Sequence, residues 1–286
     1  MPNELVEKHL HLSGAVPHKI LWEVIKQSGY KTPLKSYEAF CRFTDLKSKG
    51  SLDGYLDVLH WVDKAQSNPM AIEKCVYESF ASNAVNGVKR LELRFNPTKR
   101  SQEGTIDLDS IIVSARAGME RAKSIFGIEG GLILCMGRDC TLQANVGVWS
   151  KAMKYFKKGV IGIDLAGPYD WDAYESQRDW IKNVYWTAND QGMMTTIHAA
   201  EVDHPKIVDE IDWVISEVRP KRIGHGIQMA KYPAALDRVV ESDIELEICI
   251  SSNLNTGAVS GMNEYMDIFD KLNQAGVRYS INTDST

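Results

Sequence analysis

Short apolar runs alternate with longer amphipathic stretches along this chain. Eight of the runs are rich in apolar and β-branched residues and have the length of buried β-strands. These runs are Leu5–Leu12, Leu91–Phe95, Gly131–Met136, Val160–Ala166, Met194–Ala199, Arg222–His225, Leu246–Ile250 and Val277–Asn282. From the second run onward, the spacing leaves room for a loop, one helix and a return loop between successive strands, as parallel pairing requires.

The stretches between the runs carry the apolar i, i+3, i+4 spacing of helices that bury one face. The clearest are Ile111–Phe126, Trp171–Asn189, Pro205–Val218 and Glu264–Ala275. Gly192 and Gly276 stand where two of these helices should end. The first gap is longer, and residues 17–88 hold several helical patterns, including Lys19–Gln27 and Tyr55–Lys64. This predicts a helical insertion after the first strand, in which Trp22, Trp61 and Met70 are expected to pack in the core rather than wall a pocket.

Eight strands separated by helices predict a (β/α)8 (TIM) barrel that spans residues 1–286 as one domain. The alternative is an open doubly wound sheet, which would be expected to carry a glycine-rich phosphate-binding turn after its first strand. No such turn occurs. The sequence ends at Thr286, just past the eighth run, so we expect no final helix and a partly uncovered face beside strands one and eight. Either the sequence is a fragment or another subunit covers that face.

The composition limits which kinds of partner the protein is expected to bind. The net charge is −5 and no Lys/Arg-rich tract is present, which argues against nucleic-acid binding. No apolar stretch approaches the roughly 18 residues that span a bilayer, so no membrane segment is expected. The five cysteines form no C-x-x-C pair, and no targeting segment is visible, which favours reduced thiols and a cytoplasmic location. An oligomer remains open.

Polar residues gather where the predicted strands end, which is where barrels of this class place their active sites. Strand one ends in His9-Leu10-His11, and alternation puts both imidazoles on one face. Strand five ends at His198, with Glu201 three residues on. His225 stands between two glycines in strand six.

Strand eight leads to Asp284, a carboxylate that is costly to desolvate at the tip of an apolar strand unless it is paired or bound to a metal. Each of these groups taken alone has an ordinary explanation, such as a hydrogen-bonded core histidine or a helix cap. Together His9, His11, His198 and Asp284 offer three nitrogens and one oxygen, a plausible zinc set with room for water. His225 and Glu201 remain as an acid/base pair for metal-assisted hydrolysis.

Several motifs, in order and across nearly the whole chain, resemble the adenosine deaminase family of amidohydrolase-type barrels. They are K-H-L-H-L-S-G-A-V, L-E-L-R-F-N-P, G-I-D-L-A-G, H-A-A-E, R-I-G-H-G, I-S-S-N-L-N-T-G-A and N-T-D-S. The resemblance implies one zinc ion per chain and hydrolysis of adenosine or a related aminopurine to the oxo compound and ammonia.

The resemblance also implies roles for individual residues. The zinc ligands would be His9, His11, His198 and Asp284. Glu201 would protonate the ring nitrogen beside the attacked carbon, and His225 would orient and deprotonate the attacking water. The Gly167 N–H would meet another ring nitrogen. A metal-bridging lysine, usual in two-metal barrels of this class, is absent from Val160–Ala166, which argues for one metal.

The chain departs from the family pattern at four positions. Ala200 replaces the glycine of H-A-G-E, Pro168 stands where an acid is common, and Ser13 and Ser285 replace aspartates that face the substrate. We expect Ser13 and Ser285 to contact the small-molecule substrate, a purine nucleoside or a relative of one. The substrate stays open among adenosine, adenine, N6-methyl-AMP and aminodeoxyfutalosine, and a truncated, non-catalytic family member is the remaining alternative.

Overall fold

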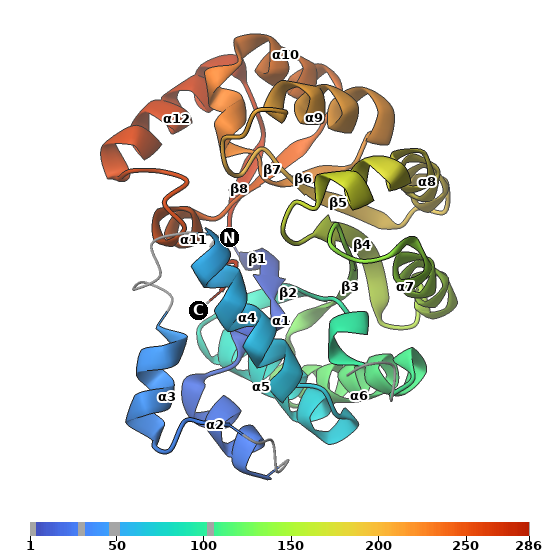
Figure 1. Ribbon diagram of the computed structural model, residues 1–286, viewed down its shortest axis with the longest axis vertical. Coiled ribbons are helices and arrows are strands. Elements are labelled where there is room, and N and C mark those ends of the chain that lie inside the picture. The colour runs from blue at the N-terminus through green and yellow to red at the C-terminus, as the bar shows by residue number, and fades with distance from the viewer. Residues whose placement is uncertain (1–3, 28–31, 46–51, 102–105, 286) are drawn as a thin grey trace.

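A computed structural model describes residues 4–27, 32–45, 52–101 and 106–285. Eight parallel strands lie in the order β1 to β8 with helices around them (Figure 1). The strands are β1 Leu5–His11, β2 Val88–Phe95, β3 Glu129–Gly137, β4 Val160–Ala166, β5 Met194–Ala199, β6 Arg222–His225, β7 Glu245–Ile248 and β8 Tyr279–Ile281. The predicted (β/α)8 barrel is therefore confirmed, and every predicted run overlaps a strand.

Two backbone hydrogen bonds bring the end of the chain back to the first strand. The His11 N–H donates to the Asp284 carbonyl at 2.9 Å, and the Asp284 N–H donates to the His9 carbonyl at 2.8 Å. An isolated parallel bridge between Leu10 and Asp284 results. Because this bridge follows β8, it nearly closes the barrel and sets Asp284 beside the two histidines of β1.

The outer helices follow their sequence signals. They are α6 Leu108–Phe126, α7 Leu142–Tyr155, α8 Trp171–Asp190, α9 Ile207–Trp213 with the π-helical turn η3 Val214–Val218, α10 Pro233–Glu241 and α12 Met262–Ala275. Asp107 accepts N–H groups at the start of α6, and Asp170 does so for α8. Gly276 ends α12 with a φ of 75°, in the left-handed region that favours glycine.

The insertion after β1 is helical, as predicted. It contains α1 Leu12–Ala15, α2 His18–Gln27, α3 Tyr37–Thr44, α4 Leu52–Ala65 and α5 Pro69–Val85. Trp22 and Trp61 are partly buried against the core, but Met70 is 83% exposed, so its predicted core position is wrong. Met70 is the second residue of α5, where the side chain faces solvent. Helix α4 contributes Leu56, Leu59 and Asp63 to the main cavity.

The outer face beside the first and last strands carries exposed apolar side chains. Leu5 of β1 and Ile281 of β8 are 59% and 58% exposed. No helix follows β8 in the described part of the chain, as the sequence predicts. Among the described residues, no helix combines the length and apolar character needed to cross a bilayer.

The barrel interior below the strand ends holds a buried layer of charges. Arg94 of β2 donates to Asp164 of β4 at 3.0 Å and to Glu247 of β7 at 2.9 Å. Arg222 of β6 pairs with Glu247 at 2.9 Å and with Glu92 at 2.5 Å. All five side chains are nearly or fully buried, so each charge depends on these partners. The layer lies directly under the site.

Candidate active site

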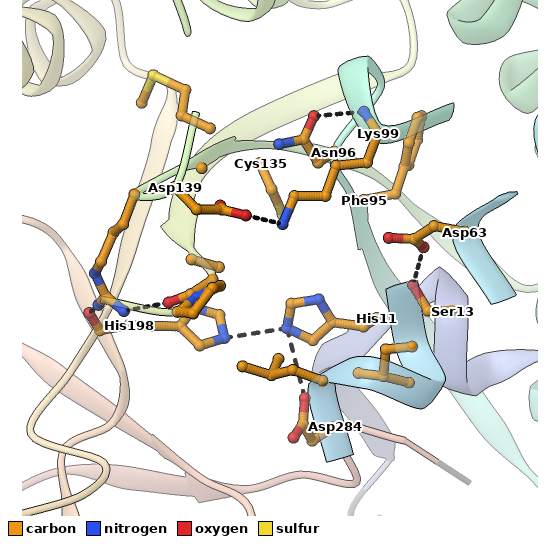
Figure 2. Close-up of a pocket in the computed structure, with 18 of the residues that line it drawn as sticks. His11, Ser13, Asp63, Phe95, Asn96, Lys99, Cys135, Asp139, His198 and Asp284 are labelled. Carbon is orange, nitrogen blue, oxygen red and sulfur yellow. Dashed lines mark hydrogen bonds and ion pairs between the residues drawn. The ribbon is translucent and has the colours of Figure 1, made fainter. Parts of the chain in front are cut away.

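A cavity of about 260 Å³ opens at the C-terminal ends of the strands (Figure 2). Its lining includes His11, His198, Glu201, His225 and Asp284, which come from β1, β5, β6 and the segment after β8. Ligand pockets in proteins range upward from about 300 Å³, so this one suits a small molecule. The location agrees with the expectation from the barrel class.

Three histidine rings and one carboxylate converge beneath this cavity. The His11 and His198 Nε2 atoms are 3.1 Å apart. The Asp284 Oδ1 atom lies 3.5 Å from both His9 Nε2 and His11 Nε2. These residues come from three segments that lie far apart in the sequence, at positions 9–11, 198 and 284, and the barrel brings them together. Figure 2 shows His11 between His198 and Asp284.

Two buried carboxylates set the orientation of these rings. His9 Nδ1 lies 2.7 Å from Glu247 Oε2, and His198 Nδ1 lies 3.1 Å from Asp164 Oδ1. A carboxylate accepts a hydrogen bond, so each neutral ring keeps its hydrogen on Nδ1 and turns a bare Nε2 toward the common centre. This is the way carboxylates commonly orient metal-binding histidines.

The electrostatics favour a cation at this centre. Burial lowers the pKa of His198 to about 4 and also lowers that of His11, so both rings are neutral at pH 7. For His9, burial and Arg94 oppose protonation, but the carboxylates of Asp284 and Glu247 outweigh them and raise its pKa to about 9. A metal ion at His9 Nε2 would supply the positive charge that the proton otherwise provides.

Three of the six ligand-atom pairs in this donor set have the spacing expected around one cation. Ligand atoms on a tetrahedral ion with bonds of 2.0–2.1 Å lie about 3.3–3.4 Å apart, close to the 3.1 and 3.5 Å separations found here. The fully buried His9 Nε2 has no hydrogen-bond partner among the described residues, which is costly unless a ligand engages it. His9, His11 and Asp284 form one group whose ligand atoms all lie within 4.8 Å of one another, and His11 and His198 belong to a second such group, so this set can hold a divalent ion.

Glu201 and His225 lie together at the edge of this centre. His225 Nε2 is 3.7 Å from Glu201 Oε2. Burial raises the pKa of Glu201, which favours its protonated form. Both residues line the cavity, so each can reach a bound ligand.

Three of the six described residues other than glycine that have a positive φ angle lie at this site. Ala200, His225 and Asp284 have positive φ angles of 49°, 61° and 62°. Residues other than glycine adopt this region at a cost, and such residues cluster at functional sites. Ala200 thus occupies a conformation that glycine would adopt with less strain. The departure noted in H-A-A-E costs stability but does not remove the turn.

Two buried side chains, Asn253 and Tyr265, support His225 through a chain of hydrogen bonds. The Asn253 Nδ2 atom lies 3.0 Å from His225 Nδ1, and the Tyr265 hydroxyl donates to Asn253 Oδ1 at 2.9 Å. Asn253 and Tyr265 are fully buried. Sequence reasoning found the I-S-S-N motif but assigned no role to its asparagine.

Arg138 ties together the loops after β4 and β5. Its guanidinium donates to the Gly167 carbonyl at 3.0 Å and also to the His198 carbonyl, and it lies 4.2 Å from the centre of the Tyr169 ring. Gly167 has a φ of 100°, and a Cβ there would lie 2.9 Å from Asp139 Oδ1. Only glycine fits both constraints. Arg138 was missed at the sequence level.

Of the other residues singled out near the substrate, three line the cavity and Ser285 does not. Ser13, Gly167 and Pro168 line the cavity. Ser285 does not appear in its lining, and its Cβ lies 2.2 Å from where a Cβ on Gly14 would be. The predicted contact of Ser285 with substrate stays a prediction.

A parallel eight-stranded barrel with histidines and carboxylates gathered at its strand ends defines a metal-dependent amidohydrolase-type enzyme. The chain matches the family model described as adenosine deaminase over residues 4–286. It therefore belongs to the adenosine deaminase family, as the motifs indicated, and is a metal-dependent deaminase.

Named relatives share most of their length with this chain. An adenosine deaminase from Clostridium botulinum (strain Hall) is 28% identical over 283 residues, covering 98% of this chain and 81% of the relative. An adenosine deaminase from Clostridium perfringens (strain SM101) is 29% identical over 286 residues, covering 98% and 82%.

Solved structures share the fold at lower identity. A zinc-bound amidohydrolase from Burkholderia ambifaria has a TM-score of 0.82 and 22% identity, covering 98% of this chain and 75% of that one. The N6-mAMP deaminase of Arabidopsis has a TM-score of 0.80 and 24% identity, covering 98% and 80%. An adenine deaminase from Arthrobacter aurescens has a TM-score of 0.77 and 18% identity, covering 98% and 81%.

Proposed function

We propose that this chain binds one zinc ion and hydrolyses adenosine, or a closely related aminopurine nucleoside, to the 6-oxo product and ammonia. The observation that carries the proposal is the convergence of His9, His11, His198 and Asp284, three of whose six ligand-atom pairs have the spacing found around one tetrahedral ion. The family relationship and the zinc-bound structural neighbour support it. These four residues would hold the ion, and the chemistry that bound zinc supplies is activation of water near neutral pH.

Glu201 is proposed as the acid. Its raised pKa leaves the carboxyl protonated more readily near pH 7, so that it can donate its proton to a ring nitrogen. The aromatic ring then accepts electrons from the attacking oxygen. The Gly167 N–H is proposed to donate to a second ring nitrogen. Arg138 donates to the carbonyl of the same glycine and so helps to position its backbone for this contact.

His225 is proposed to orient the attacking water and accept its proton at Nε2. This requires the hydrogen on Nδ1 and the flipped orientation of the Asn253 amide, in which its oxygen, in place of the nitrogen that faces Nδ1 in the structure, accepts that hydrogen. The Tyr265 hydroxyl can donate or accept, so it supports either orientation of the amide. The proton on His225 Nε2 can then pass to the leaving amino group.

Charge pairing in the cavity supports a neutral substrate over a nucleotide. Among the described lining residues, each cation has an acidic neighbour. Lys99 lies 2.9 Å from Asp139, Arg100 lies 2.7 Å from Asp63, and Arg138 lies 3.8 Å from Glu210. A phosphate group would have to compete with these acids. We therefore favour a nucleoside over N6-methyl-AMP, and keep adenine and aminodeoxyfutalosine as alternatives.

Release of ammonia, or of methylamine from N6-methyl-AMP, by zinc-loaded protein tests the proposal. Adenosine, deoxyadenosine, adenine, N6-methyl-AMP and aminodeoxyfutalosine are compared, with Glu201→Gln as the control. We expect the highest kcat/KM with a nucleoside, and a loss of about 10²–10⁴-fold in the variant, with zinc retained. No ammonia from any aminopurine would refute the proposed function. Loss of zinc in Glu201→Gln would refute the proposed role of Glu201.

A further inference from the structure

Three side chains form a buried polar cluster on one wall of the cavity. Ser13 of α1 donates its hydroxyl hydrogen to Asp63 Oδ1, and Arg100 of η2 (Thr98–Arg100) lies 2.7 Å from the same oxygen. All three residues line the cavity, yet the Asp63 and Arg100 side chains are only 9% and 1% exposed. Figure 2 shows Asp63 and Ser13 on the side of the cavity away from His198.

Hydrogen bonds within the cluster fix which of its groups donate and which accept. Arg100 Nη2 donates to Ser13 Oγ at 3.1 Å and to Gln66 Oε1 at 2.9 Å, while its Nη1 donates to the Asn96 carbonyl at 3.1 Å. These contacts lock the guanidinium in place. The Ser13 hydrogen is committed to Asp63, so the hydroxyl has no hydrogen left for a ligand.

The second Asp63 oxygen is the group that remains for a ligand. The described contacts of the carboxylate both fall on Oδ1, and Oδ2 turns toward the cavity in Figure 2. A carboxylate that is ionised only accepts hydrogen bonds. This wall of the cavity therefore accepts donors such as hydroxyl groups and repels anions such as phosphate.

We propose that Asp63 is a specificity-determining residue that accepts a hydrogen bond from a hydroxyl-bearing substituent on the aminopurine ring. The inference rests on the proposed deaminase function and names its substrate class: nucleosides, in preference to nucleotides or unsubstituted bases. Ser13 and Arg100 position the carboxylate. No sequence motif pointed to Asp63, because its place at the cavity depends on how α4 packs against α1 and η2.

The test compares three substrates in zinc-loaded wild type and Asp63→Asn. Adenosine carries hydroxyls, 9-ethyladenine carries none, and adenosine 5′-monophosphate adds a phosphate. Asparagine keeps an oxygen for Ser13 and Arg100 but removes the charge. We expect kcat/KM for adenosine to fall about 10- to 100-fold, because hydrogen bonds to charged groups are the strong ones. The value for 9-ethyladenine should change less than about threefold, and the preference for adenosine over the monophosphate should fall at least about tenfold.

Asp139→Asn is the matched control, since it removes one negative charge from the same cavity at the Lys99 pair. It should shift the ratio of adenosine to 9-ethyladenine by less than about threefold. If both variants shift this ratio equally, the effect of Asp63 comes from the overall negative charge of the cavity and not from a specific contact. That result would overturn the proposal. An equal loss on all three substrates in Asp63→Asn would also overturn it, because that pattern indicates structural damage.

A binding measurement separates this inference from the proposed chemistry. Dissociation constants for inosine and hypoxanthine, measured by calorimetry, need no turnover. Asp63→Asn should weaken inosine binding about tenfold or more and leave hypoxanthine unchanged. If wild-type protein turns over no aminopurine yet shows this split, the deaminase proposal fails and the Asp63 subsite stands. If turnover occurs but both ligands bind equally in wild type and variant, only the Asp63 inference fails.

Discussion

Replacing Glu247 with glutamine should weaken metal binding and destabilise the barrel together. The carboxylate of Glu247 lies 2.7 Å from His9 Nδ1, 2.9 Å from Arg94 and 3.1 Å from the Thr196 hydroxyl. Its other oxygen lies 2.9 Å from Arg222 Nε. All of these neighbours present hydrogens, so an amide nitrogen in place of either oxygen must face a donor.

The structure sets the size of both effects. Removing one partner of a buried charge pair costs about 3–5 kcal/mol, because the remaining charge is left uncompensated. Domains of 150–250 residues lose about 2–4 °C in Tm per kcal/mol, so Tm should fall by about 6–20 °C. Losing the carboxylate that orients a metal-binding histidine typically lowers metal affinity about 10- to 100-fold.

Two assays on purified protein check these numbers. Thermal unfolding of the metal-free protein measures stability, and competition with a chelator measures zinc affinity. Glu92→Gln is the matched control, because Glu92 is equally buried and pairs with Arg222 but does not touch His9. The control should lose stability and keep zinc affinity within about threefold. The reasoning is refuted if Glu247→Gln binds zinc as tightly as wild type, or if Glu92→Gln weakens binding just as much.

Four further outcomes are expected. Ala200→Gly should raise the free energy of unfolding by about 1 kcal/mol, because it relieves a positive φ; a fall in Tm would contradict this. His11→Ala should lose bound metal and activity together, and full metal occupancy would remove His11 from the ligand set. Asn253→Ala should lower kcat about tenfold or more with zinc retained, since His225 loses its support; an unchanged kcat would contradict this. Burial opposes ionisation of Glu247, but Arg94 and Arg222 outweigh it and lower its pKa, so this group's contribution to stability is present above pH about 4 and is lost as pH falls below that; metal-free unfolding that is insensitive to pH there would contradict it.

Sequence periodicity predicted the central strands, such as β3, β4 and β5, because each is a compact apolar run that is mostly buried on both faces. The prediction failed where an apolar run crosses an element boundary. The run Leu246–Ile250 was interpreted as one strand, but β7 ends at Ile248, and Cys249 instead precedes α11 (Ile250–Asn255). Apolar residues at such a boundary are compatible with either a strand or a helix, so periodicity does not locate the end.

The proposed ligand and acid/base residues could be found because they stand at strand ends, where a barrel makes distant segments meet. Their supporting partners could not. Arg94, Asp164 and Glu247 are visible as charges inside apolar runs, but their pairing depends on the registers of β2, β4 and β7 across the barrel. Asp63 gave even less signal, since a charged residue on an amphipathic helix ordinarily faces solvent.

The central claim is that one metal ion lies where four side chains from three distant segments of the sequence converge. A crystal of the protein grown with zinc, with anomalous data collected on both sides of the zinc absorption edge, tests it directly. We expect one strong peak per chain, within bonding distance of the Nε2 atoms of His9, His11 and His198 and of the Asp284 carboxylate. A peak that excludes His198 or Asp284, or no peak at this centre, would contradict the account.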